Sequence, residues 1–207
     1  QMSWDDVQVQ LADPAREAFG EQFVNVIGNL GNAKIEGYDL DVTALLGDNW
    51  AVGFNVNETT KNELKSITSV TDPFGRAESV PTGLEPTQEL PLFPDMSWSA
   101  YIEYSRDLGW FDGGSGYVRL QHSDTGEALT RIDDTFASPR YTLEGFGSTD
   151  LKLGFEATDW TAQLFINNLD DVRGITFRTN FFGNNFGQSN DDVIRPRSMG
   201  VSFRKSF

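Results

Sequence analysis

Apolar and polar residues alternate with period two through much of this chain of 207 residues. Such alternation places one set of side chains on each face of a β-strand. In the segment 50–57, one face carries Trp50, Val52, Phe54 and Val56, and the other carries small or polar residues. We expect further strands of this kind at 7–11, 38–44, 98–104, 117–121, 151–157, 160–166 and 195–207. The pattern therefore predicts an all-β protein with about eight strands, each with one apolar face.

The connections between these segments alternate strictly between short and long. Short connections are expected at 46–50, 107–115 and 157–160, and long polar ones at roughly 12–22, 67–95, 124–140 and 173–193. Outer-membrane barrels have short periplasmic turns and long extracellular loops. The Greek-key crossovers of a soluble β-sandwich do not predict this rhythm. The sequence therefore favours an antiparallel transmembrane β-barrel over a soluble sandwich.

Composition excludes several classes of function. The formal net charge of −15 argues against nucleic acid as a partner, because a phosphate-binding surface needs the opposite sign. The chain has no cysteine, which excludes disulfides and thiolate metal sites. Its single histidine, His122, excludes a multi-histidine metal site, and no Gly-x-Ser-x-Gly segment marks a nucleophile. We therefore expect no enzymatic activity, no resident metal and no cofactor.

Aromatic residues stand at the ends of several apolar faces. A transmembrane barrel places such rings in girdles at the two membrane interfaces. In the last segment, the apolar face contains Phe203 and the final residue, Phe207. The residues expected in the girdles or in closure of the barrel are Trp50, Trp98, Trp160, Phe203 and Phe207.

Four motifs, in order along the chain, resemble one family. The segment 29–40 is similar to Asn-x-Gly-x-Ala-x-x-x-Gly-x-Glu-x, with Asp39 in place of the glutamate. Leu-Pro-Leu-Phe-Pro at 90–94 resembles the entry into a late hairpin, and 165–173 resembles the Asn-Leu-x-Asp end of a penultimate strand. Arg195-Pro-Arg-Ser resembles the start of a final strand. The chain looks like the C-terminal barrel portion of a TonB-dependent outer-membrane receptor.

The resemblance implies an architecture. Such receptors are 22-stranded barrels with an N-terminal plug, and nothing here resembles a plug. We therefore expect residues 1–207 to be the C-terminal part of the barrel, with the plug and earlier strands outside this sequence. The alternative is a complete eight-stranded barrel, which would have to fill its lumen with packed side chains. Inward residues such as Gly53, Asn55 and Gln163 suit a water-lined wall better.

The resemblance also implies a function and a set of partners. The expected activity is import of a scarce nutrient, with a ferric siderophore as the first candidate and an oligosaccharide or another nutrient as alternatives. A complete small barrel would instead be a structural anchor or an adhesin. The implied partners are outer-membrane lipid, the small-molecule cargo, TonB and its inner-membrane complex through the plug, and the barrel assembly machinery through the last strand. The implied location is the bacterial outer membrane.

Two long connections hold the candidate ligand-binding residues. Apolar rings beside amide groups suit an aromatic siderophore or a sugar face, although the same rings could pack against neighbouring loops. The candidates are Phe181, Phe182, Asn184, Asn185 and Phe186 in one connection, and Phe74 and Arg76 in another.

Paired acids recur along the chain, and carboxylates can bind calcium. Since no Asp-x-Asp-x-Asp-Gly loop is present, we expect the pairs at 5–6, 133–134, 170–171 and 191–192 to be solvated. Asp171, in the Asn-Leu-x-Asp motif, is expected to accept a hydrogen bond at a loop base beside Arg173.

Overall fold

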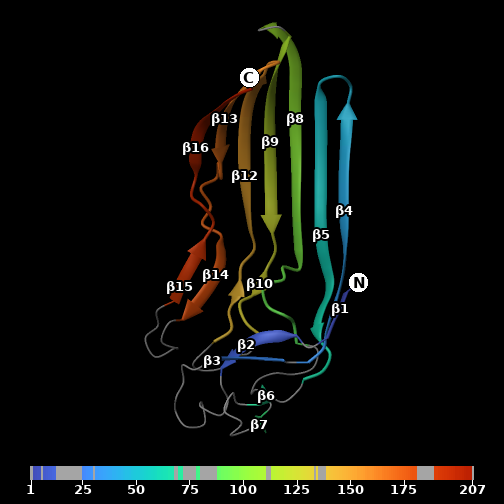
Figure 1. The fold of residues 1–207 in the computed structure, drawn as a ribbon, viewed down its shortest axis with the longest axis vertical. Helices are drawn as coiled ribbons and strands as arrows, with labels where there is room; N and C mark the ends of the chain where they lie inside the picture. Colours follow the sequence, from blue (N-terminus) through green and yellow to red (C-terminus); the bar gives the residue numbers. More distant parts are fainter. Residues whose placement is uncertain are drawn as a thin grey trace.

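A single antiparallel sheet of eight strands dominates the fold (Figure 1). The structure is a computed structural model. It describes residues 2–5, 7–12, 25–29, 31–67, 70–71, 78–79, 88–110, 113–132, 134, 139–180 and 189–206. In spatial order the sheet consists of β1 (Met2–Trp4), β4 (Ala33–Leu46), β5 (Trp50–Leu64), β8 (Met96–Trp110), β9 (Gly114–Thr125), β12 (Phe146–Glu156), β13 (Trp160–Asn167) and β16 (Ser198–Lys205). Within these residues no helix is long and apolar enough to cross a membrane.

The sheet confirms the predicted fold class. Sequence neighbours β4–β5, β8–β9 and β12–β13 pair antiparallel through short turns, which lie together at the top of the view (Figure 1). The sheet is open: β1 and β16 form its two edges and do not pair with each other. Since a β-sandwich requires a second sheet packed against the first, this single broad wall does not have the layers of a soluble sandwich.

One predicted connection was too long. Residues 107–115 were expected to form a loop, but Asp107 pairs with Ser115 and Trp110 pairs with Gly114, with a register shift between these pairs. Only residues 111–113 connect β8 to β9. Gly109 and Gly113 have φ values of 65° and 91°, which glycine adopts without strain. The glycine-rich stretch is therefore mostly an irregular ladder.

Each long connection carries a short ladder of its own, at the end of the sheet opposite the turns (Figure 1). The ladders are β2 (Gln8–Ala12) with β3 (Asn25–Asn29), β6 (Val70–Thr71) with β7 (Glu78–Ser79), β10 (Ala128–Leu129) with β11 (Thr142–Leu143), and β14 (Ile175–Asn180) with β15 (Ser189–Val193). The alternation of short and long connections is therefore as predicted, but the long ones are partly ordered hairpins.

The predicted wall strand at 7–11 was wrong. Within the described part of the chain this segment contributes to β2, which pairs with β3 outside the wall, and the wall position belongs to β1, which pairs with Ala33–Ile35. Val7 is buried and its amide donates to the carbonyl of Gly31 at 2.8 Å. Alternation alone does not distinguish apolar residues that face lipid from apolar residues that contact protein. Val7 contacts protein, because it is buried in the core.

The buried core lies beneath the long connections rather than along the wall. It consists of Val7, Ala33, Leu64, Leu90 and Ile132, with Ile35, Ile67 and Phe93 packed against it. Backbone hydrogen bonds bring its segments together: the Leu64 amide donates to the carbonyl of Gln88 at 2.8 Å, and the Leu92 amide donates to that of Leu129 at 2.8 Å. The core therefore joins three long connections, through Val7, Leu90 and Ile132, to the ends of β4 and β5.

Candidate functional site: the two faces of the wall

The register of the sheet brings the predicted apolar sets of its strands, all but the one at 7–11, onto one face, here called the apolar face. Directly paired residues share a face and lie within contact distance. One row across the sheet runs Ala44, Val52, Ile102, Leu120, Leu151, Ile166 and Met199; the next runs Leu46, Trp50, Tyr104, Val118, Leu153, Leu164 and Val201. Val201 and Phe203 are 75% and 66% exposed. An apolar surface of this extent is expected to meet lipid rather than water.

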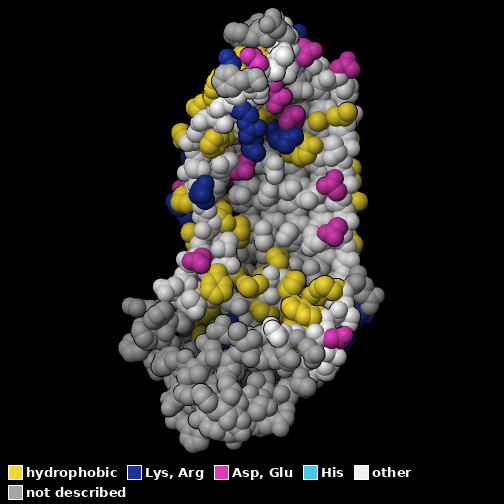
Figure 2. Space-filling model, viewed as in Figure 1, with side chains coloured by type: hydrophobic (Ala, Val, Ile, Leu, Met, Phe, Trp, Pro, Cys, Tyr) yellow, Lys and Arg dark blue, Asp and Glu magenta, His cyan; other side chains and the backbone are white. Residues whose placement is uncertain are grey.

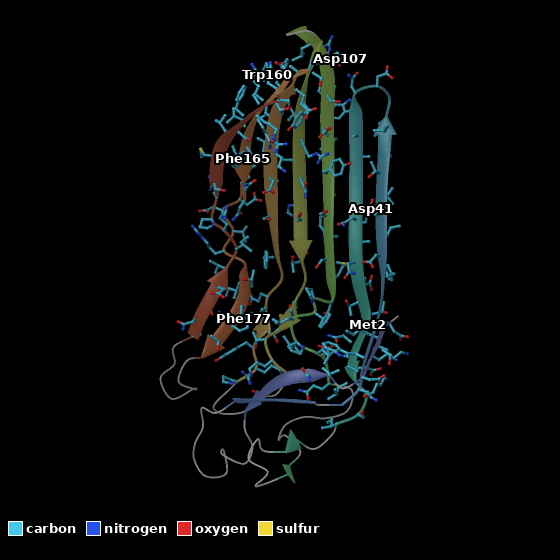
Figure 3. The ribbon with its side chains drawn as sticks, viewed as in Figure 1. Met2, Asp41, Asp107, Trp160, Phe165 and Phe177 are labelled. Atoms are coloured by element: carbon cyan, nitrogen blue, oxygen red, sulfur yellow. The ribbon has the colours of Figure 1, made fainter. Side chains whose placement is uncertain are left out.

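Aromatic clusters stand at both ends of the apolar face. At the turn end, Trp50 lies 4.9 Å from Tyr104, and Trp160 lies 5.9 Å from Phe203 between ring centroids. Trp160 and Asp107 both lie near the turns in Figure 3. Toward the loops, the Trp98 ring lies 6.2 Å from Phe54 and 5.4 Å from His122. The structure thus places four of the proposed girdle residues in three aromatic groups, two near the turns and one toward the loops. Phe207 lies outside the described residues, and the girdle role of the set stays a prediction.

The opposite face of the wall, here called the polar face, is lined by short polar side chains and a central group of charges. One row runs Asp41, Asn55, Ser99, Ser123 and Ser148. Nearer the turns, Arg119 Nε donates to Glu103 at 2.8 Å, and its guanidinium lies 4.2 Å from the centre of the Tyr101 ring. Lys152 is the direct partner of Arg119 on the next strand. Figure 2 shows charged side chains gathered in the upper half of this hollowed face.

Three aromatic rings on the polar face lie over glycines of the neighbouring strand. The pairs are Gly53 with Tyr101, Gly154 with Tyr117, and Gly200 with Phe165. Each pair consists of direct partners in the register. At each glycine a Cβ atom would come closer to the ring than real Cβ contacts do. The missing side chain therefore lets each ring lie along the wall.

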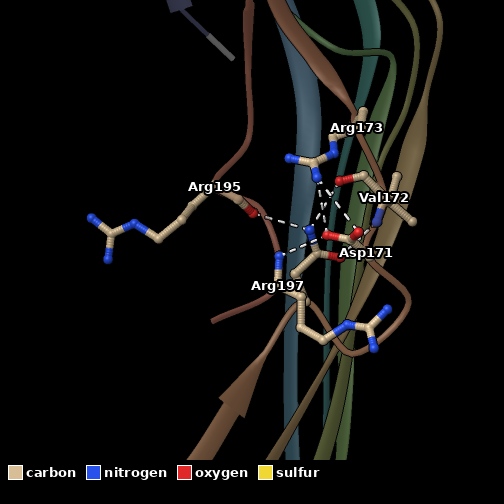
Figure 4. A network of polar contacts seen from close by, with 6 residues as sticks. Asp171, Val172, Arg173, Arg195 and Arg197 are labelled. Atoms are coloured by element: carbon tan, nitrogen blue, oxygen red, sulfur yellow. Dashed lines mark hydrogen bonds and ion pairs between the residues drawn. The ribbon is translucent and has the colours of Figure 1, made fainter. Parts of the chain in front are cut away.

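A cluster of polar contacts closes the base of the last long connection (Figure 4). Asn168 is buried; its side-chain amide donates to the carbonyls of Val172 and Arg195 at 2.9 and 3.0 Å, and its carbonyl accepts the Val172 amide at 3.0 Å. The Asn168 amide donates to Asp150 at 2.9 Å. Through its backbone amide and its side chain, Asn168 therefore connects β12 to both ends of the β13–β16 connection.

The predicted role of Asp171 is confirmed. Its Oδ1 accepts the Arg197 amide at 2.9 Å, and the Arg173 guanidinium lies 3.4 Å away. The hydrogen bond from Arg197 is the main reason that the pKa of Asp171 is lowered, and the charges of Arg173 and Arg197 add to it. Asn168 and Asp171 have φ values of 52° and 53°, a left-handed conformation that Asn and Asp tolerate better than most residues.

The Asn168→Ala variant is expected to loosen the loop base. It removes three side-chain hydrogen bonds and places alanine in a left-handed conformation, which together cost about 2–4 kcal/mol locally. Hydrogen exchange on the full-length protein should show the Val172 and Arg197 amides exchanging at least about tenfold faster. The neighbouring exposed residue supplies the control, because Asp170→Ala should leave both rates unchanged. Unchanged protection in Asn168→Ala would contradict the assigned role.

A recess of about 350 Å³ lies among the long connections, between 142–146, 172–175 and Arg178. The Arg178 guanidinium donates twice to Asp191, at 2.7 Å each, and lies 5.6 Å from the centre of the Tyr141 ring. The hydrogen bond from Arg178 is the main reason that the pKa of Asp191 is lowered. Phe177, on the same strand as Arg178, lies far from the turns in Figure 3.

The candidate ligand residues of the sequence, which are Phe74, Arg76, Phe181, Phe182, Asn184, Asn185 and Phe186, lie outside the described residues. Sequence reasoning did not single out Arg178 or Tyr141. The Arg178–Asp191 ion pair joins strands β14 and β15, whose register no motif shows. Among the described residues no group of three or more His, Cys, Asp and Glu side chains could hold a metal ion. His122 instead contacts Thr149, with Nδ1 and Oγ1 3.0 Å apart.

Comparison with known proteins identifies the class. The family described as TonB dependent receptor-like, beta-barrel matches residues 2–169. The match covers most of the chain, and the protein belongs to this family, whose barrels lie in the bacterial outer membrane.

Among solved structures, the ferric yersiniabactin uptake receptor FyuA from Yersinia pestis is similar, with a TM-score of 0.66 and 18% identity. The similarity covers 99% of this chain and 26% of FyuA. At this identity it shows the fold alone. No curated protein matches the sequence.

Proposed function

We propose that this chain forms wall and outer loops of a receptor that imports a nutrient across the outer membrane with energy from TonB. The observation that carries the proposal is the opposite polarity of the two faces of one sheet. The apolar face suits lipid, and the polar face suits a water-filled lumen. In this proposal the role is transport without catalysis. Coupling to TonB runs through a plug, and the barrel assembly machinery inserts the last strand.

A ferric siderophore is our first candidate for the cargo. FyuA, which shares the fold, is described as an uptake receptor for ferric yersiniabactin. The recess near Arg178 supports this choice, since Arg173 and Arg178 line it and their guanidinium groups could donate to an oxygen-rich ligand. An oligosaccharide is the second candidate. It is favoured by the row of carboxylate, amide and hydroxyl groups from Asp41 to Ser148 on the polar face.

Uptake by the native host tests both candidates. A strain that lacks the full-length gene, and a second strain that lacks TonB, should fail to accumulate the same radiolabelled cargo. The panel should contain ferric hydroxamate, catecholate and phenolate siderophores labelled with radioactive iron, and labelled neutral oligosaccharides. Loss of siderophore uptake in both strains supports the first candidate, and loss of oligosaccharide uptake supports the second. Unchanged uptake of the whole panel, or uptake that persists without TonB, would contradict the proposal.

A further inference from the structure

The two faces of the wall exchange their polarity near the loop ends of β4 and β5. The ladder has an irregularity here: Glu36 pairs with Lys61 and Gly37 pairs with Thr59, so that Thr60 is extra. On the turn side of this bulge, the polar face carries Asp39 paired with Asn57. On the loop side, the same face carries Ala33 paired with Leu64, and both are buried in the core.

The opposite surface changes in the other direction. On the turn side of the bulge, it is the apolar face, with Leu40 and Val42 exposed. On the loop side, Lys34, Glu36, Lys61, Glu63 and Lys65 replace them. Lys34 Nζ lies 2.8 Å from Glu36, Lys61 Nζ lies 3.2 Å from Glu63, and Lys65 also pairs with Glu63. The bulge therefore coincides with the border between an apolar surface and a fully charged one.

Lys61 and Lys65 present positive charge on this surface, whereas the side chains of Lys34 and Glu36 are 28% and 31% exposed and offset each other. The side chains of Lys61 and Lys65 are 44% and 43% exposed, whereas the Glu63 side chain that they share is 15% exposed. The two ammonium groups therefore cover the carboxylate. The Glu63 carboxylate accepts a hydrogen bond from Lys65 and lies 3.2 Å from Lys61 Nζ, so it holds both lysines in place. Lys34, Lys61 and Lys65 are here called the lysine patch.

The lysine patch lies at the height of a headgroup layer. Tyr38 is the last aromatic residue of the apolar face before the bulge, and its hydroxyl donates to Glu58. Lys61 lies opposite Glu36, two residues beyond Tyr38, which is about 7 Å of extended strand. The polar layer of a bilayer is of similar depth on each side. Three of the five lysines of a chain with net charge −15 belong to the patch.

We propose that the lysine patch binds phosphate groups of lipids in the outer leaflet, with the apolar face of β4 and β5 beneath it in contact with their acyl chains. The ammonium groups donate to phosphate oxygens, and the shared carboxylate pre-orders two of the donors. A lipid fits both surfaces at once, because its phosphate can lie against the lysine patch while its acyl chains lie against the adjacent apolar face. Glu58, the nearest further acid on this surface, interacts with the Tyr38 hydroxyl.

Lipid binding by the full-length receptor in detergent tests the proposal. The probes are a bis-phosphorylated lipid A and the same lipid without its phosphates, with bound lipid counted by native mass spectrometry. We expect the Lys61→Gln/Lys65→Gln variant to bind the phosphorylated lipid roughly tenfold more weakly than the natural protein. The matched Lys61→Arg/Lys65→Arg variant keeps the charges and should bind nearly as well. Heat-dependent mobility in detergent gels establishes that both variants are folded.

Three outcomes would overturn the proposal. The glutamine variant could bind the phosphorylated lipid as tightly as the natural protein does. The lipid without phosphates could bind equally well, which would assign the binding to the acyl chains alone. Millimolar inorganic phosphate could displace the lipid completely, which would make the patch a site for soluble phosphate instead.

Discussion

The Leu120→Arg variant is expected to destabilise the folded wall in a membrane by about 2–4 kcal/mol, the range for a cation on the lipid face near the bilayer midplane. Leu120 is exposed on the apolar face, and its direct partners on the two neighbouring strands are Ile102 and Leu151. It lies between the aromatic cluster around Trp98 and the one around Trp50. A guanidinium at this height cannot easily reach either polar layer.

The matched control is one residue away. Gln121 lies on the polar face, where its partners are Tyr101 and Asp150, and Gln121→Arg should change stability by less than about 0.5 kcal/mol. Urea unfolding of the full-length protein in lipid vesicles, followed by heat-dependent gel mobility, measures both. Equal effects of the two substitutions would mean that the apolar face does not meet lipid.

The wall strands could be predicted because successive side chains of such a strand lie on opposite faces, one apolar and one polar, so that side-chain polarity alternates at every residue. A shift of one residue in register would exchange the two faces, so the alternation at 50–57 fixes how β5 pairs with its neighbours. The loop ends of β4 and β5 were not predicted, because the polarity of the two faces reverses there. Beyond the bulge at Gly37, apolar residues belong to the inner surface, and the pattern that marks 38–44 reverses at 33–36. Period-two reasoning therefore ended β4 and β5 at the membrane border.

The loop base shows which parts of the site were accessible to sequence reasoning. Asp171 could be assigned because its acceptor role depends on a local motif. Asn168 could not be assigned, since its partners Asp150 and Arg195 are far along the chain in both directions. Arg178 has the same difficulty, because its partner Asp191 is set by the β14–β15 register. Contacts that depend on the pairing of distant segments cannot be predicted from any short motif.

The Gly154→Val variant is expected to destabilise the wall by about 1–3 kcal/mol, the usual cost of adding side-chain volume where there is no space. A Cβ at this position would overlap the Tyr117 ring, so the ring would have to leave the wall and project into the lumen. The phenol would then lose its contact with β12. Tyr117→Ala, in contrast, removes the ring and adds no volume at Gly154, so its cost is lost packing alone.

The contact between Gly154 and Tyr117 can be tested by a double-mutant cycle, because Tyr117→Ala removes the ring with which the valine of Gly154→Val would clash. In the Gly154→Val/Tyr117→Ala protein the valine can occupy the space that the ring leaves. The double variant should therefore be less destabilised than the sum of the single variants by about 1 kcal/mol or more, which is the coupling expected of residues in direct contact. The same urea titration in vesicles provides the three free energies. Strict additivity would mean that the ring does not lie over Gly154 in the membrane. A coupling would assign the same arrangement to Gly53 with Tyr101 and to Gly200 with Phe165, whose geometry is alike.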